Sequence, residues 1–253
     1  MKFSLKSIAA AVVMAASASA SFAAIDNGAG GNGGLFFSAW DANGSYSRSL
    51  NISIDSFQAA IAAAGSFDQT WASDAAFTGF MSTADTASLK WNIVAFDTSG
   101  AQRIVETYST LPAVAVKDTI VRASTTGGQQ FVNAVNSVLV GDSAVVGAAS
   151  SAWAGKSTFN DTFGLMNFSN AGSVANNSYA SGLGVLRIDS KATGQLLSIN
   201  TPYVDGTAVN AWVAADGLHI AAAVAAVPEP ESYAMFLAGL GMLGFMARRN
   251  KRA

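Results

Sequence analysis

Residues 35–55 read LFFSAWDANGSYSRSLNISID and carry the clearest strand pattern of the chain. Leu50, Ile52 and Ile54 alternate with polar residues, which predicts a strand over 46–55 with one face toward a core and the other toward water. Residues 35–40 are the expected partner strand, because Asn-Gly in the intervening turn 41–44 favours the positive φ angles of a tight hairpin. This stretch therefore predicts an antiparallel β-hairpin.

Three more pairs of strand-like segments follow along the chain, each pair separated by turn residues such as Asp, Ser, Thr and Gly. Four hairpins in one chain predict a mainly β fold, an antiparallel β-sandwich or a barrel-like domain. The three further pairs are 90–96 with 102–108, 183–189 with 195–200, and 209–214 with 218–224.

Two stretches have helical spacing instead and predict two short helices. One begins after Ser56 and stops at Gly65, and the other lies around residues 131–139. The apolar positions are Phe57, Ala60, Ile61 and Ala64 in the first, and Phe131, Val132, Val135, Val138 and Leu139 in the second.

The composition fits one globular domain without disulfides: 253 residues, 51% hydrophobic, 12% charged and no cysteine. Residues 24–227 hold 8 Lys and Arg against 14 Asp and Glu, a net charge of −6. So few basic residues neutralise few phosphates, which argues against nucleic-acid binding.

The N-terminus has the features of a secretory signal peptide over residues 1–23. Lys2 and Lys6 precede an apolar stretch, 8–16, that is shorter than the about 20 residues of a membrane span. Small residues then predict signal-peptidase cleavage between Ala23 and Ala24, with a second possible site after Ala20. Signal peptidase and the general secretion machinery are the expected partners.

The residues after this leader suggest where the folded domain begins. Five glycines fall within 28–34, so residues 24–34 are expected to form a flexible segment with little core to contribute. The β-rich extracellular domain is expected over 35–226.

The last segment, 227–253, has three parts: Val227-Pro228-Glu229-Pro230, an apolar run over 233–247, and a basic end with Arg248, Arg249, Lys251 and Arg252. The two prolines favour an extended backbone, as a protease recognition segment requires. As a helix the 15-residue run would be about 22 Å long, against about 30 Å of hydrocarbon core, and could span only with help from its flanks. The basic end is expected on the cytoplasmic side, and a plain tail anchor is the alternative.

This tail resembles the PEP-CTERM sorting domain of Gram-negative bacteria that make exopolysaccharide. Pro228-Glu229-Pro230 is similar to the name-giving motif, Gly239-Leu240-Gly241-Met242-Leu243 to its glycine-bearing apolar helix, and Arg248-Arg249 to its basic stop. The resemblance implies that a membrane-embedded exosortase, a cysteine transpeptidase-like enzyme, cleaves near the motif. It implies no fold or activity for the remaining residues, since such tails occur on unrelated domains.

The chain contains few residues suited to catalysis. His219 is its only histidine and lies in a strand-like run without a G-x-S-x-G elbow elsewhere, so a half-exposed structural histidine is expected. One histidine and no cysteine argue against zinc, and Ser150 stands where a phosphate loop ending at 155–157 needs glycine. No catalytic residue, cofactor or metal is therefore predicted.

Carboxylates keep other chemistries open. Glu106 is the only glutamate of residues 24–227, whereas Asp is frequent, so calcium or glycosidase sites built on Asp are alternatives. The expected turns hold Asp41, Asp97, Asp205 and Asp216, where Asp bonds its own backbone. Sequons begin at Asn43, Asn51, Asn160, Asn167 and Asn176.

The sequence thus predicts an exported, non-enzymatic, β-rich protein. Its tail would hold it transiently in the inner membrane before it reaches the cell surface or extracellular matrix. A structural or adhesive role in an exopolysaccharide or biofilm matrix is expected, with exopolysaccharide as partner. The alternatives are a carbohydrate-binding module, with exposed aromatic residues such as Trp40 or Trp153, and an Asp-dependent glycan hydrolase.

Overall fold

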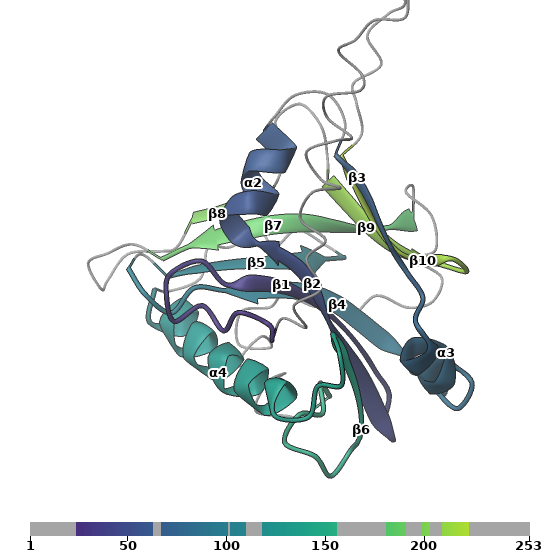
Figure 1. Ribbon diagram of the computed structural model, residues 1–253. Helices are drawn as coiled ribbons and strands as arrows, with labels where there is room; N and C mark the ends of the chain where they lie inside the picture. The colour runs from purple at the N-terminus through teal and green to yellow at the C-terminus, as the bar shows by residue number, and fades with distance from the viewer. Residues whose placement is uncertain are drawn as a thin grey trace, which may run out of the picture.

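The computed structural model describes residues 24–62, 67–100, 102–109, 118–155, 181–190, 199–202 and 209–222. Within these ranges one antiparallel sheet curls into a half-barrel, with helices packed on it (Figure 1). Its strands are β1 (Gly34–Trp40), β2 (Gly44–Ser53), β3 (Asp68–Ala72), β4 (Lys90–Phe96), β5 (Arg103–Tyr108), β6 (Ser143–Gly147), β7 (Leu183–Asp189), β8 (Ile199–Pro202), β9 (Val209–Ala214) and β10 (Gly217–Ala222). The helices are α2 (Ile54–Ala62), α3 (Ala75–Met81) and α4 (Asp118–Asn136).

The predicted mainly β, barrel-like fold is confirmed, with a single curled sheet in place of the two packed sheets of a sandwich. The strand order is β3-β10-β9-β7-β5-β4-β1-β2-β6, and β8 pairs with β7. All four predicted hairpins pair antiparallel: β1 with β2, β4 with β5, β7 with β8, and β9 with β10. The second strand of the third hairpin covers 199–202, where 195–200 was expected.

The concave face of the sheet holds the larger core. Leu35, Phe37 and Ala39 of β1 point into it, and α2 and α3 add Phe57 and Phe77. Phe37 and Phe77 meet edge to face, with ring centroids 5.8 Å apart. Such pairs add specificity to the apolar burial that stabilises the fold.

The opposite face is buried as well, because α4 packs along it (Figure 1). Phe36 and Trp40 alternate with the concave-face residues of β1 and contact this second core. Gly128 permits a close approach of α4, since a Cβ there would overlap the ring of Phe96.

The prediction that the polar face of residues 46–55 meets water is wrong for the first part of β2. Ser45, Ser47 and Ser49 are buried. The Ser47 and Ser38 hydroxyls share a hydrogen bond of 2.9 Å, and the Ser45 hydroxyl accepts one from Ala154 N–H at 3.0 Å. Small hydroxyl side chains can be buried when they are hydrogen-bonded. In this part of β2, both the apolar face and the serine face of the strand are therefore buried.

The helices differ from the prediction in extent and number. Ile54, expected in a strand, begins α2, and α4 covers 118–136, so Val138 and Leu139 lie beyond its end. A third helix, α3, was not predicted; Asp74 caps it by accepting a hydrogen bond from Phe77 N–H at 2.6 Å. The edge strands β3 and β6 were also missed, and each has only five residues.

The expectation that residues 24–34 contribute little core is wrong. Ile25 is 1% exposed and packs in the α4 core. The side-chain amide of Asn136 bonds the backbone of Ile25 twice: it accepts from the Ile25 N–H at 2.9 Å and donates to the Ile25 carbonyl at 2.8 Å. A Cβ on Gly28 or Gly33 would overlap the Phe96 carbonyl, so these glycines allow close packing and the folded domain begins before residue 35.

Candidate functional site

A cavity of about 410 Å³ opens on the concave side of the sheet, between β1, β4, the end of β9 and α3. This volume lies within the range of pockets that bind small molecules. The lining residues are Phe37, Ala39, Ser73, Phe77, Thr78, Met81, Leu89, Trp91, Val213, Ala214 and Ala215.

The cavity changes from apolar at its floor to polar at its mouth. Phe37, Ala39 and Trp91 form the floor and are at most 3% exposed. Ser73 and Thr78 are exposed and bring hydroxyl groups to the lining. None of the lining residues is charged, so the lining offers no side-chain carboxylate, imidazole or amine for acid–base chemistry.

Beside the cavity, side chains bridge β2 and β3 across the gap left by the curled sheet. Arg48 Nη1 donates to the carbonyl of Ala72 at 2.6 Å, and the indole N–H of Trp71 donates to the carbonyl of Leu50 at 3.0 Å. The Tyr46 hydroxyl donates to Asp74 Oδ2 at 2.7 Å, which ties β2 to the start of α3. We call these three contacts the seam.

The Tyr46 contact in the seam makes stability sensitive to alkaline pH. Burial, followed by the hydrogen bond to Asp74, raises the pKa of Tyr46 well above its usual value of 10. A group with a raised folded-state pKa stabilises the fold below its unfolded pKa and loses that contribution as pH rises. We expect the free energy of unfolding to fall from about pH 9 to pH 11, and Tyr46→Phe to flatten this decline.

Urea unfolding at each pH measures this effect. Burial also raises the pKa of Tyr108, so Tyr108→Phe is the comparison variant that keeps the Tyr46 contribution. An alkaline decline as steep in Tyr46→Phe as in the natural protein would contradict the assignment.

His219 lies on β10 as the half-exposed strand histidine that the sequence predicts. Its Nε2 is 2.8 Å from Asp216 Oδ1, its Nδ1 is 3.0 Å from the Thr70 hydroxyl, and the ring stacks on Trp212 with centroids 4.9 Å apart. The hydrogen bond to His219 lowers the pKa of Asp216. Because its neighbours Leu218 and Ile220 point into the concave core, His219 faces the other side of the sheet, away from the cavity.

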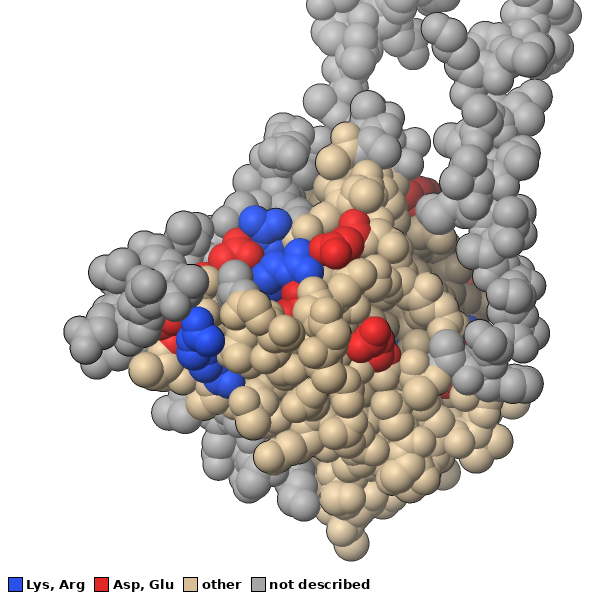
Figure 2. Space-filling view, turned by 60° about the vertical axis from the view of Figure 1, so that its left-hand side comes forward, with Lys and Arg blue, Asp and Glu red and all other residues tan. Residues whose placement is uncertain are grey.

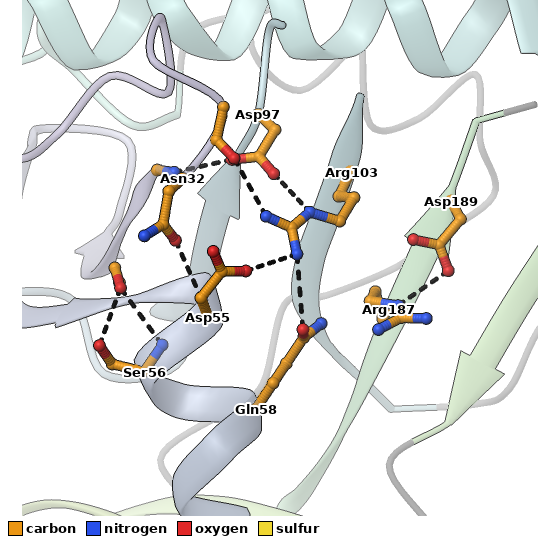
Figure 3. Close-up of polar contacts among 11 residues, drawn as sticks. Asn32, Asp55, Ser56, Gln58, Asp97, Arg103, Arg187 and Asp189 are labelled. Carbon is orange, nitrogen blue, oxygen red and sulfur yellow. Dashed lines mark hydrogen bonds and ion pairs between the residues drawn. The ribbon is translucent and has the colours of Figure 1, made fainter. Parts of the chain in front are cut away.

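A charged cluster that the sequence analysis missed centres on Arg103 (Figure 3). Its guanidinium donates to Asp97 Oδ2, to Asp55 Oδ1 at 2.7 Å and to the Gly31 carbonyl at 3.1 Å. Burial lowers the pKa of Arg103, but the two carboxylates outweigh burial and raise it overall. The cluster joins β5, the turn after β4, α2 and the segment before β1.

The remaining arginines of the described ranges are paired in the same way. Arg48 contacts Asp142, Arg122 contacts Asp118 and Arg187 contacts Asp189. Figure 2 shows most charged residues of one face beside residues of opposite sign, with a wide uncharged surface around them.

Asp41 bonds the backbone of its own turn, as expected, whereas the carboxylate of Asp97 bonds the distant Gly33 and Arg103. Asp41 accepts backbone hydrogen bonds from Asn43, Gly44 and Asp85 at 2.8–3.0 Å. Burial raises the pKa of Asp41, but these hydrogen bonds outweigh it and lower the pKa overall. Asp97 accepts from Gly33 N–H at 2.7 Å.

The other predicted carboxylate and sequon positions are spread over the fold. Glu106 is fully buried on β5, and Asp205 lies outside the described residues. No three His, Asp or Glu within the described ranges gather as a metal site. Asn43 and Asn51 are exposed, whereas Asn160, Asn167 and Asn176 lie outside the described residues.

The tryptophans named for a sugar-binding platform pack on the domain. Trp40 is 5% exposed, so it cannot present an open face to a sugar ring. Trp153 is half-buried and its indole N–H donates to the Asp41 carbonyl at 3.2 Å. The two rings therefore do not form the exposed pair that a carbohydrate-binding module of this design requires.

The predicted processing residues lie mostly outside the described part of the chain. Ala24 is described and exposed, whereas Ala23 and the whole tail 227–253 are not described. Those tail residues are Val227, Pro228, Glu229, Pro230, Gly239, Leu240, Gly241, Met242, Leu243, Arg248, Arg249, Lys251 and Arg252. In the part that the structure describes, no helix is long and apolar enough to cross a membrane.

Comparison with known proteins identifies the tail and nothing else. Residues 226–252 match the family model of the PEP-CTERM protein-sorting motif. No curated protein and no solved structure is significantly similar to the chain. This sorting motif indicates an exported protein that an exosortase sorts. The chain therefore carries a PEP-CTERM sorting motif at residues 226–252.

Proposed function

We propose that the mature protein is a non-enzymatic structural or adhesive component of an extracellular polysaccharide matrix at the cell surface. The observation that carries this proposal is the sorting motif at residues 226–252, joined to a β-rich domain. A protein sorted in this way works outside the cytoplasm, where stable folded domains can serve as matrix building blocks.

The geometry of the domain supports a role without catalysis. The cavity lining contains no charged residue, and the histidine–aspartate pair lies on the other side of the sheet. A glycan hydrolase needs two carboxylates that flank one bond in a shared cleft. Asp55 and Asp97, which approach one another in the Arg103 cluster, are both ion-paired to that arginine.

Gene deletion with complementation tests the matrix role. We expect deletion to lower the mechanical cohesion of the matrix while the amount of exopolysaccharide stays constant. The full-length gene should restore cohesion, whereas a gene that ends before residue 226 should not. Cohesion that does not change on deletion would contradict the proposal, as would glycan cleavage by the purified protein.

A further inference from the structure

We propose that the cavity between α3 and the concave face of the sheet binds a small neutral amphiphile, with its apolar body on the floor and its uncharged polar end at the mouth. This inference does not depend on the matrix role. It rests on the burial and chemistry of the lining residues and on the position of the lining strands in the sheet.

The floor favours an apolar body. Phe37 and Trp91 of the floor come from the adjacent strands β1 and β4, and Leu89 directly precedes β4; all three are 1–5% exposed. Phe77 of α3 adds an aromatic wall and is 8% exposed. Apolar and aromatic surfaces of this kind gain free energy when a ligand displaces water from them.

The lining disfavours charged and sugar ligands. A carboxylate or ammonium group would lose its hydration without finding a partner of opposite charge, because no lining side chain is charged. A sugar brings many hydroxyl groups, and the exposed side chains of the lining offer the hydroxyls of Ser73 and Thr78, the second of which already donates to the Asp74 carbonyl. A single uncharged polar group, such as an alcohol, can find its hydrogen-bond partners among these hydroxyls.

The sheet topology disfavours an extended peptide. β1, β4 and β9 each pair with strands on both sides, so they have no free edge to which a peptide strand could add. The α3 wall is also fixed in place: Asp74 caps its first turn and accepts from Tyr46. The cavity is therefore preformed and suited to a compact molecule.

Fluorescence titration of the intact protein with N-phenyl-1-naphthylamine, a neutral aromatic amine, tests the proposal. We expect saturable binding of one probe per protein, and displacement by 1-octanol. Octanoate at pH 8 has a similar apolar chain but a charge, so its displacement should be at least tenfold weaker. Non-saturable probe binding, or equal displacement by octanoate, would overturn the proposal.

Two variants locate the site. Thr78→Trp and Ala215→Trp place a large ring at the mouth from α3 and from the β9–β10 turn, and each should weaken probe binding at least tenfold. Thr126→Trp is the matched control, because Thr126 is an exposed helical threonine whose hydroxyl donates to the carbonyl four residues earlier, as Thr78 does.

Circular dichroism identifies any variant that fails to fold. If one of the two mouth variants is unfolded, the probe affinity of the other tests the location of the site. Probe affinity that is unchanged in a folded mouth variant would show that the probe binds elsewhere and would overturn the assignment. An equal loss in Thr126→Trp would do the same.

Discussion

Replacing Pro228 and Pro230 together by alanine is expected to leave the C-terminal tail attached to the exported protein. Proline favours an extended backbone and has no N–H donor, whereas alanine would permit a helical backbone at both positions. Intact mass of the protein recovered outside the cell measures the effect. The natural protein should end near Pro228–Pro230, and the variant should retain Arg248 and Arg249.

Two controls separate sorting from general effects on export. Pro112→Ala changes a proline outside the motif and should leave processing intact. A strain without its exosortase should give the natural chain the same untrimmed mass as the double variant. Trimming of the double variant at the natural position would show that the prolines do not govern recognition, and the same tail in both strains would indicate a simple anchor.

Replacing Arg103 by methionine is expected to produce a much larger loss of stability than the same change at Arg187. Asp97 is 2% exposed in its pair with Arg103, so removing the guanidinium leaves a buried carboxylate without its cationic partner. Breaking such a pair costs on the order of 3 kcal/mol in the free energy of unfolding. Urea unfolding measures this loss.

Arg187→Met is the matched control, since both arginines lie on neighbouring strands (Figure 3). Arg187 and Asp189 are 32% and 26% exposed, and exposed pairs contribute at most about 1 kcal/mol. Equal losses in the two variants would mean that the Arg103 cluster contributes no more than a surface ion pair.

The sequence predicted the hairpins well because their signals are local. The alternation of Leu50 and Ile52 and the Asn-Gly turn before Ser45 depend only on neighbouring residues. The extent of α4 was underestimated because its middle holds Thr125, Thr126, Gly127 and Gly128, all weak helix formers. Packing of Gly128 against Phe96 is a tertiary contact, and no local pattern reveals it.

The candidate cavity was not predicted from the sequence. Its walls come from β1, β4, β9 and α3, which are distant in the chain and meet only when the sheet curls. One local signal was available: Asp74 followed by Phe77, Phe80 and Met81 is typical of a capped amphipathic helix. The sorting tail, by contrast, was fully recognisable, because an enzyme reads it as a linear motif and not as a folded surface.

In the proposed matrix role, the seam that ties β2 to β3 and to the start of α3 has a mechanical consequence. Ladder hydrogen bonds within a sheet are many and share a pulling force, whereas three side-chain contacts can break one after another. Tension between β2 and β3 would therefore open the half-barrel at the seam first, while β3 stays hydrogen-bonded to β10. The domain would first open locally at the seam, while the hydrogen-bonded strand pairs of the sheet remain intact.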